Sequence, residues 1–398
     1  MRILVVMDVY APSRISAAGM MRDFVRALRD QGHSPVVLVP GEGLGAAVLV
    51  DELDGTPVVR VAAPQTKDVG RVRRALAEWW LPWALLRGLA RSPYADTSWD
   101  GLVWYSPTIF LGPLVRRLAR KHRCRAYLIL RDLFPDWALD AGVLRDGLVY
   151  RYFKRVERGQ YAAADVIGVQ TPANAPLVEA DAPAGARIEV LNNWMAEPLP
   201  APTSFALSQG PLAGRTVFAY TGNMGAAQGM DALLDLAVAL RDRRDIGFLF
   251  VGRGSELPRL REMAKEARLD NIQFLDEVDA SEIPGILAQC HIGLIALDPR
   301  HKTHNIPGKL ITYLHAGLPV LARINAGNDL EALIVDEALG FVVAGGDASP
   351  LVRHAVALAE DGALRQRMGG NGRRAAVRFF SPQAAARQVI AGLLSAPR

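Results

Sequence analysis

The chain has 398 residues, 50% hydrophobic and 22% charged, which is the composition of a globular protein and excludes a largely disordered one. This length suits two or three domains that each bury their own core. The 46 Lys and Arg exceed the 41 Asp and Glu by five, which favours anionic partners without choosing among nucleotides, phospholipids and nucleic acid.

The N-terminal segment 1–7 predicts a strand, because its apolar run is too short for a signal peptide and Asp8 follows it. The longest membrane candidate, 79–86, is far below the 18 apolar residues of a spanning helix. Cys124 and Cys290 lie far apart in apolar surroundings, which is typical of buried free thiols in a reducing compartment. We therefore expect a cytoplasmic protein.

Short apolar runs alternate with segments of helical periodicity in both halves of the chain. The runs predict buried parallel strands at 3–7, 36–39, 101–104, 127–130, 166–169, 217–220, 247–251, 272–274 and 292–296. This alternation predicts an α/β fold of doubly wound sheets. Because the proline-rich stretch 197–211 interrupts it, we predict a domain of residues 1–200, a second of 211–380, and a C-terminal helix 381–398 packing back on the first.

Two loops after predicted strands contain small residues suited to ligand binding. The first, 8–19, precedes a helix expected at 20–31, although an ordinary strand-to-helix turn explains it equally well. The second, 222–229, precedes a helix expected at 232–240, and its glycines would let backbone N–H groups face a phosphate. Neither the second loop nor Gly252-Arg253-Gly254 has the dinucleotide spacing G-x-G-x-x-G, and Gly308-Lys309 lacks the upstream glycine of a P-loop.

Two cationic residues of the second half lie next to boundaries of predicted strands or helices. Arg253 comes directly after the strand 247–251, and Lys309 stands at the start of a predicted helix. Both could converge on a diphosphate, whereas the alternative for each is a solvated surface charge.

Five segments in this order carry a family resemblance. They are Arg-Ile-Leu-Val-Val at 2–6, Tyr220-Thr221-Gly222-Asn223-Met224-Gly225 with Gln228-Gly229, Phe250-Val251-Gly252-Arg253-Gly254, Asn271-Ile272-Gln273-Phe274, and Pro307-Gly308-Lys309-Leu310-Ile311-Thr312-Tyr313-Leu314-His315-Ala316-Gly317-Leu318-Pro319-Val320. Over nearly the whole chain the sequence resembles family 4 glycosyltransferases. It looks closest to the surface-polysaccharide branch and is similar to the WbuB-like N-acetyl-fucosamine transferases of O-antigen assembly.

The resemblance implies the GT-B fold, in which two Rossmann-like domains face each other across a cleft. It implies a UDP-sugar donor in the second domain, an acceptor in the first, retention of the anomeric configuration, and no metal or other cofactor. The transferred sugar would be an N-acetylated or deoxy hexose. The acceptor would be a lipid-linked molecule or lipopolysaccharide at the inner face of the cytoplasmic membrane, used in surface-polysaccharide biosynthesis.

The resemblance also assigns site residues. Donor-binding positions are Gly222, Asn223, Gly225, Gln228, Arg253, Val278, His304, Pro307, Gly308, Lys309 and Thr312. Acceptor-side positions are Arg14, Ser16, Gly19 and Arg131, and the catalytic positions are Asp132, Arg253 and Lys309. Asp132 would orient or deprotonate the acceptor hydroxyl, although it could instead cap its turn and pair with Arg131.

The chain departs from the family pattern at the donor site. His304 and Thr312 stand where many members have the two glutamates of the E-x7-E motif, the second of which binds ribose. Asn223 and Gln228 replace the arginine and lysine that bind phosphate in many relatives. Arg253 and Lys309 are therefore the important remaining cations.

Two basic segments predict outward-facing surfaces. The segment 71–91 mixes arginines with three tryptophans, which is typical of an interfacial membrane helix. Its membrane-docking candidates are Arg73, Arg74, Trp79, Trp80 and Trp83. The segment 116–125 has six basic residues in ten and could face anionic lipid, unless both segments are solvated helix faces. Nucleic acid is not expected, because no stacking or reading motif accompanies these charges.

A metal site is not expected, since His301 and His304 lack further ligands nearby. Three alternative functions stay open. A sugar-nucleotide epimerase of the same fold would act without an acceptor. A dinucleotide-dependent oxidoreductase is disfavoured by the glycine spacing, and a non-catalytic lipid- or polysaccharide-binding protein would show no donor turnover.

Overall fold

A computed structural model of residues 1–398 describes 1–13, 15–41, 43–66, 69–140, 142–199, 202–298, 306–345, 347 and 349–395. The chain forms two compact units, Met1–Trp194 with Pro382–Arg398, and Met195–Ser381. The chain therefore passes from one unit to the other just before the predicted proline-rich boundary. Across the described residues, we find no helix that combines the length and hydropathy needed to cross a bilayer.

The first unit is built on an eight-stranded sheet in the order β3-β4-β2-β1-β5-β6-β7-β8, parallel except for the antiparallel pair β3 and β4. Its strands are β1 (Arg2–Val6), β2 (Ser34–Gly41), β3 (Val48–Leu53), β4 (Thr56–Ala62), β5 (Gly101–Ser106), β6 (Arg125–Leu130), β7 (Val166–Val169) and β8 (Arg187–Val190). Its strand order reverses between β1 and β5, which is where ligands bind in open α/β sheets.

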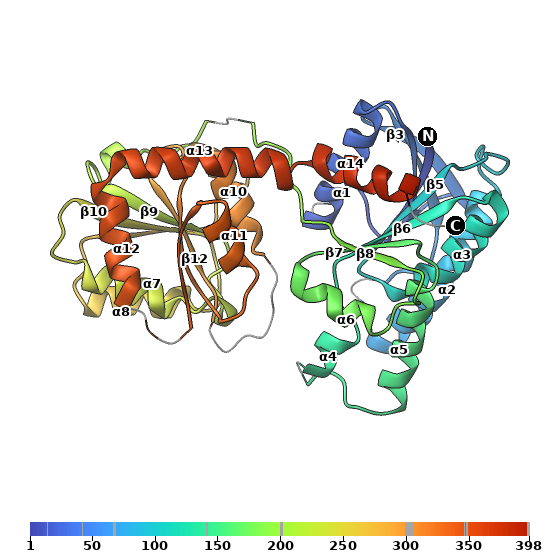
Figure 1. The fold of residues 1–398 in the computed structure, drawn as a ribbon, viewed down its shortest axis with the longest axis horizontal. Coiled ribbons are helices and arrows are strands. Elements are labelled where there is room, and N and C mark those ends of the chain that lie inside the picture. Colours follow the sequence, from blue (N-terminus) through green and yellow to red (C-terminus); the bar gives the residue numbers. More distant parts are fainter. Residues whose placement is uncertain are drawn as a thin grey trace. The chain divides into compact units, whose positions relative to one another are not determined.

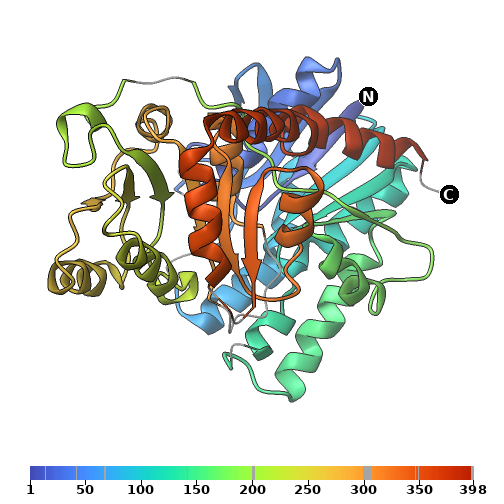
Figure 2. The same ribbon diagram turned by 60° about the vertical axis from the view of Figure 1, so that its left-hand side comes forward.

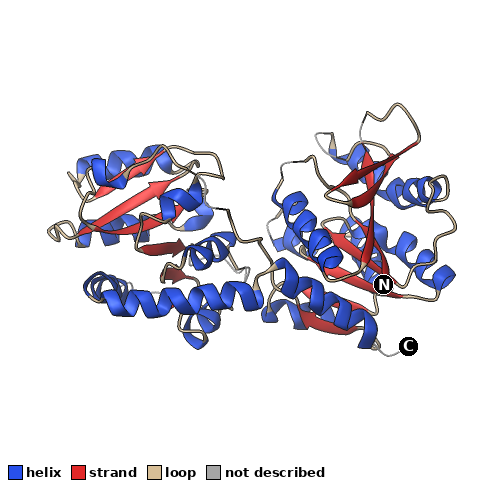
Figure 3. Cartoon of the chain, turned by 90° about the horizontal axis from the view of Figure 1, so that it is seen from above, coloured by secondary structure: helices blue, strands red, loops and turns tan. Residues whose placement is uncertain are grey.

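Helices flank this sheet (Figures 1 and 3). They are α1 (Ser16–Asp30), α2 (Arg71–Leu89), α3 (Gly112–His122), α4 (Asp136–Asp140), α5 (Leu148–Tyr161), α6 (Ala175–Glu179) and α14 (Pro382–Ser395), with 3-10 turns at η1 (Ile109–Leu111) and η2 (Pro172–Asn174). The helix α14 packs against α1 (Figure 1). Its Val389 and Leu393 join the core that contains Tyr127 of β6.

The second unit has a wholly parallel six-stranded sheet in the order β11-β10-β9-β12-β13-β14. Its strands are β9 (Thr216–Thr221), β10 (Ile246–Val251), β11 (Ile272–Leu275), β12 (Ile292–Ala296), β13 (Val320–Ile324) and β14 (Gly340–Ala344). The strand order reverses between β9 and β12.

Helices lie on both faces of this second sheet as well, and Figure 2 shows α12 and α13 in orange and red beside its strands. They are α7 (Asp231–Ala239), α8 (Leu257–Glu266), α9 (Ile283–Leu287), α10 (Gly308–Ala316), α11 (Leu330–Asp336), α12 (Ser349–Glu360) and α13 (Gly362–Phe379), with 3-10 turns at η3 (Leu207–Gln209) and η4 (Ala226–Gln228). In both units the central strands are buried apart from their first residues, Arg2 of β1 and Thr216 of β9, as their continuous apolar runs predict.

Candidate active site

In the second unit, the loops that follow β9 and β12 meet at the carboxyl edge of the sheet. The backbone N–H of Asp298 donates to the carbonyl of Ala227 at 3.1 Å. A Cβ at Gly229 would lie 3.0 Å from the Asp298 Cα, so only a glycine allows this approach. Because the strand order reverses at this point, the edge has the geometry of a ligand site in a doubly wound fold.

Lys309 lies in the first turn of α10 and reaches back to the loop after β9. Its Nζ is 3.6 Å from the ring centroid of Tyr220 and 3.4 Å from the side-chain oxygen of Gln228. Its Cε would be 3.9 Å from a Cβ at Gly222, so the ammonium lies beside the glycine-rich loop. The phenol of Tyr220 donates to the carbonyl of Asn223 at 2.6 Å and fixes the ring beneath the lysine.

The surroundings of this lysine favour its neutral form. Burial lowers the pKa of Lys309 to about 7 from its usual 10.5. No acidic side chain is placed within 4.0 Å of its Nζ among the described residues. A cation without a carboxylate partner at a helix start suits an anionic ligand such as a phosphate, which would favour the charged form.

Glycines hold the loops after β9 and β10 against each other. The N–H of Gly222 donates to Val251 at 2.9 Å, and the N–H of Met224 donates to Arg253 at 2.7 Å. Gly252 and Gly254 have φ values of +140° and +153°. A Cβ at either position would lie within 2.3 Å of the carbonyl oxygen of Gly222 or Met224. The pattern Gly252-Arg253-Gly254 thus serves close backbone approach rather than a dinucleotide fingerprint.

The other predicted donor residues occupy the same edge with different exposure. The Arg253 side chain is 77% exposed and pairs with Glu277 at 3.2 Å. Val278 packs against the core, and Thr312 lies one turn after Lys309 on α10, with its hydroxyl 3.9 Å from the Met195 sulfur. Exposed or half-buried positions on the two loops are Asn223, Gly225, Pro307 and Gly308.

In the first unit, Arg131 follows β6 and joins strand ends. Its guanidinium donates to the carbonyls of Leu191 at 2.9 Å and Asn192 at 3.2 Å, and it lies 5.1 Å over the ring of Trp194. Burial lowers its pKa to about 10. These contacts tie the guanidinium to strand ends of the first unit, whereas the alternative pairing with Asp132 is not among the ion pairs of the described residues.

Asp132 is the exposed acidic residue at this edge. The protein around it removes part of its hydration and raises the pKa of its carboxyl group. Ser16 and Gly19 are exposed in the first turns of α1, and a Cβ at Gly19 would meet nothing within 4 Å. The edge therefore offers the exposed carboxylate of Asp132, the half-buried carboxylate of Asp8 after β1, and an open helix start. Arg14 of the first unit and His304 of the second lie outside the described residues.

Two polar residues that sequence reasoning missed lie at the same edge. Gln170 and Thr171 directly follow β7 and are buried, and the Thr171 hydroxyl has no hydrogen-bond partner among the described residues. The signal was available, since polar residues directly after an apolar run lie at the carboxyl end of a strand.

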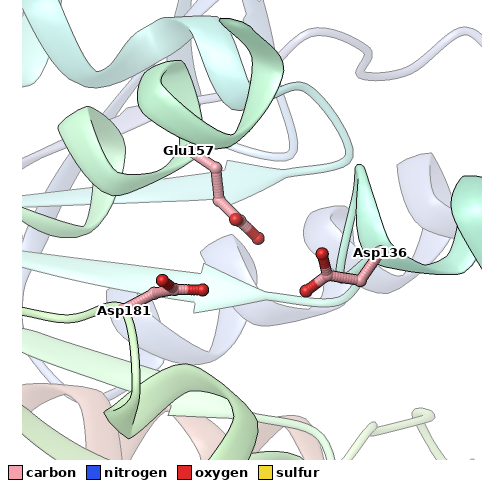
Figure 4. A group of neighbouring side chains, drawn as sticks. All are labelled: Asp136, Glu157 and Asp181. Carbon is pink, nitrogen blue, oxygen red and sulfur yellow. The ribbon is translucent and has the colours of Figure 1, made fainter. Parts of the chain in front are cut away.

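Three carboxylates gather elsewhere in the first unit. Asp136, Glu157 and Asp181 have ligand atoms within 4.8 Å of one another and point toward a common centre (Figure 4). The Nζ of Lys154 lies 2.6 to 2.7 Å from an oxygen of each, and Arg158 pairs with Asp181 at 2.8 Å. Lys154 and Arg158 offset two of the three negative charges, so this geometry is that of a partly buried ion-pair network.

The predicted membrane-docking residues lie on α2. Ala77, Leu81 and Leu85 face the core, whereas Trp79 and Trp80 are 52% and 40% exposed. Trp83 is also exposed, as are Arg73 and Arg74. The exposed face of the helix therefore carries three tryptophans together with arginines, and such a cluster of large apolar side chains is unusual for a helix at a water-facing surface.

Sequence models of two glycosyltransferase families match the two units. "Glycosyl transferase 4-like domain" matches residues 17–194, and "Glycosyl transferases group 1" matches residues 215–361. The chain is a GT4-type glycosyltransferase. The second match contains every described donor-side residue, from Gly222 to Thr312.

Curated relatives of this glycosyltransferase are distant. The glycosyltransferase WbjE of Pseudomonas aeruginosa is 25% identical over 231 residues, which are 57% of this chain and 58% of that protein. The colanic acid biosynthesis glycosyl transferase WcaI of Escherichia coli is 24% identical over 60% of this chain and 61% of its own. The chain thus matches about three fifths of the length of these relatives.

Solved structures match this glycosyltransferase over nearly its whole length. Sucrose-phosphate synthase of Thermosynechococcus elongatus has a TM-score of 0.70 at 16% identity, covering 98% of both chains. Anabaena HepE in complex with UDP has a TM-score of 0.67 at 15% identity, covering 99% of this chain and 100% of its own. WaaG, a glycosyltransferase of lipopolysaccharide biosynthesis, has a TM-score of 0.64 at 15% identity, covering 97% of this chain and 99% of its own. The predicted GT-B fold, with two Rossmann-like domains, is confirmed.

Proposed function

We propose that this glycosyltransferase moves a sugar from a UDP-sugar to a lipid-linked or lipopolysaccharide acceptor in surface-polysaccharide biosynthesis. The sugar is an N-acetylated or deoxy hexose, transfer retains the anomeric configuration, and no metal takes part. The second unit holds the donor and the first holds the acceptor. This proposal includes the finer likeness to the WbuB-like branch and a location at the inner face of the cytoplasmic membrane.

The observation that carries the proposal is the half-buried Lys309 ammonium beside the glycine-rich loop. A diphosphate placed there would favour the charged form of Lys309, which burial disfavours. It would also accept hydrogen bonds from backbone N–H groups at the start of α10. As the sugar departs, negative charge grows on the leaving diphosphate, and a fixed cation stabilises it without reorganisation. The solved neighbour HepE was crystallised with UDP, with UDP and glucose, and with UDP-glucose, which supports a uridine donor.

Calorimetric titration with UDP, GDP and NAD in excess EDTA tests the donor. We expect UDP to bind without metal. GDP is a reasonable comparator, since one relative is named a GDP-mannose-dependent mannosyltransferase of Corynebacterium glutamicum. Preference for GDP would change the proposed donor from a UDP-sugar to a GDP-sugar. Binding of NAD alone would overturn the proposal in favour of an oxidoreductase.

Asp132 is proposed to orient or deprotonate the acceptor hydroxyl. We expect Asp132→Asn to lower kcat about 100-fold, since a positioned base contributes about 10²–10⁴. UDP affinity should stay unchanged because the residue lies in the other unit. Steady-state kinetics decide this, with the exposed Asp146→Asn as control. Equal kcat in both variants would show that Asp132 only shapes its turn.

The exposed tryptophans of α2 are proposed to dock the protein on the membrane. We expect Trp79→Ala with Trp80→Ala to reduce partitioning onto anionic liposomes about 30-fold or more, because each large apolar side chain contributes on the order of 2 kcal/mol when buried. Liposome sedimentation measures this. Val377→Ala, at a 61% exposed apolar position of the second unit, is the control and should leave binding intact. Undiminished binding of the tryptophan variant would refute docking through α2.

A further inference from the structure

The first unit contains a hollow between α2, α3 and α5 that the site above does not use. The three helices lie side by side (Figure 1), and the hollow has a volume of about 670 Å³, within the range of small-molecule sites. Its apolar lining includes Trp79 and Trp83 of α2, Phe110 of η1, and Tyr152 of α5. Its four charged residues are the arginines Arg116, Arg117, Arg120 and Arg155, so every charge in the lining is positive.

These arginines lack the anionic partners that neighbouring arginines have. Within the described residues, Arg117, Arg120 and Arg155 form no ion pair and no side-chain hydrogen bond. Nearby on the same helices, Arg74 pairs with Glu78 at 2.7 Å and Arg158 with Asp181 at 2.8 Å. Repulsion among uncompensated cations is relieved by a ligand with more than one negative charge.

The apolar part of the lining is exposed as well. Tyr152 is 46% exposed, and Trp79 and Trp83 add a further uncovered apolar surface beside the cations. A second hollow of about 660 Å³ shares Trp83 and Arg117 with the first and continues along α2 and α3 to Trp99. The 19 residues of α2 span about 28 Å, so the two hollows together form a groove suited to an extended chain.

We propose that this groove binds a single long-chain lipid phosphate or diphosphate, the carrier to which the acceptor sugar is attached. This inference rests on the proposed lipid-linked acceptor. The hydrocarbon chain of the lipid packs against Trp79 and Trp83, and the arginines bind the phosphate. The 3-10 turn η1 follows β5 directly, so Phe110 places one end of the groove at the carboxyl edge that carries Asp132. The cations of the hollow lie on two helices, α3 and α5, so they can contact one phosphate group from two sides.

Farnesyl diphosphate is the test probe, because it joins a short isoprenoid chain to a diphosphate. Binding to the full chain is followed by tryptophan fluorescence, with saturating UDP present to occupy the donor site. We expect it to bind more tightly than inorganic pyrophosphate or farnesol alone. Arg117→Ala with Arg120→Ala should weaken its binding about tenfold or more. Arg151→Ala removes an exposed arginine of α5 outside the groove and should change nothing.

Two results would overturn the groove: undiminished binding by the double arginine variant, or pyrophosphate binding as tight as that of farnesyl diphosphate. UDP binding by the same variants is the separate readout of the donor site. Intact UDP binding with a lost groove would reject this inference alone, whereas groove binding without sugar transfer to any lipid acceptor would reject the proposed function.

Discussion

Replacing Lys309 by methionine is expected to weaken UDP binding about 30-fold or more, because removing one partner of a buried charge pair costs about 2–5 kcal/mol. Methionine keeps most of the side-chain volume over Tyr220, so packing of α10 on the loop persists. Calorimetry measures the loss. Arg253→Ala, at the 77% exposed and solvent-screened cation, should cost only about threefold. Equal losses in the two variants would contradict the central role of Lys309.

The same lysine makes UDP binding dependent on pH. With the pKa of Lys309 at about 7 in the free protein, the ammonium is largely neutral at pH 8, and a bound diphosphate raises that pKa. Binding above pH 7 then takes up a proton, and affinity should fall about tenfold per pH unit until the pKa of the complex is reached. Calorimetry in two buffers of different ionisation enthalpy counts the proton. An affinity that is constant from pH 7 to 9 would exclude this coupling.

Protein stability should change in the opposite direction. In the unfolded chain the lysine titrates near 10.5, whereas in the folded protein it titrates near 7. Between these values folding releases a proton, so the cost of burying the lysine is full below pH 7 and disappears as the pH rises through 10.5. Lys309→Met should therefore raise the Tm of the ligand-free protein at neutral pH while it weakens UDP binding, a trade-off common at functional sites.

Gly252→Ala is expected to weaken UDP binding about 100-fold or more, since strain and displacement of the loop together cost several kcal/mol. The residue has φ +140°, and an added Cβ would lie within 2.1 Å of the Gly222 carbonyl oxygen. The loop that carries Gly222 must then move away from β10 and from the Lys309 ammonium. Titration with UDP gives the affinity, and circular dichroism shows whether the sheet persists.

Gly214→Ala is the matched control for that variant. Gly214 also has a positive φ, +75°, in the same unit, but a Cβ there would meet nothing within 4 Å. Both variants place alanine at a positive φ, at a cost of roughly 1 kcal/mol for Gly214 and of roughly 1–3 kcal/mol at the φ of +140° of Gly252, and only Gly252→Ala adds a collision beside the site. UDP affinity that is equal in the two variants would show that the loop contact does not shape the donor site.

The buried parts of both sheets were predictable from continuous apolar runs, because strands covered on both faces have no polar alternation. The hairpin of β3 and β4 was missed, since the exposed edge strand β3 carries Asp51 and Glu52 and does not read as a core strand. The strands β13 and β14 were also missed. Arg323 interrupts the apolar pattern of β13. It can be buried because its guanidinium donates a hydrogen bond to the Val343 carbonyl, a contact that only the folded chain brings about.

Candidate site residues were predictable only as far as strand ends could be located. Gly222 and Lys309 could be named because each adjoins a predicted strand or helix boundary. The ring of Tyr220 beneath Lys309 could not, since 89 residues separate the two in sequence and only tertiary packing brings them together. The three backbone carbonyls that Arg131 contacts could not be predicted either, because two of them belong to residues 60 and 61 positions away in the sequence.

The crossing of the chain between units at residues 194–195 and again at 381–382 also sets an order for folding during synthesis. The second unit is one uninterrupted segment and is complete once Ser381 has left the ribosome. The first unit, although translated first, lacks Val389 and Leu393 of its core until α14 emerges. Domains usually fold in order from the N-terminus. Here the core of the first unit can be completed only after the whole second unit has been synthesised.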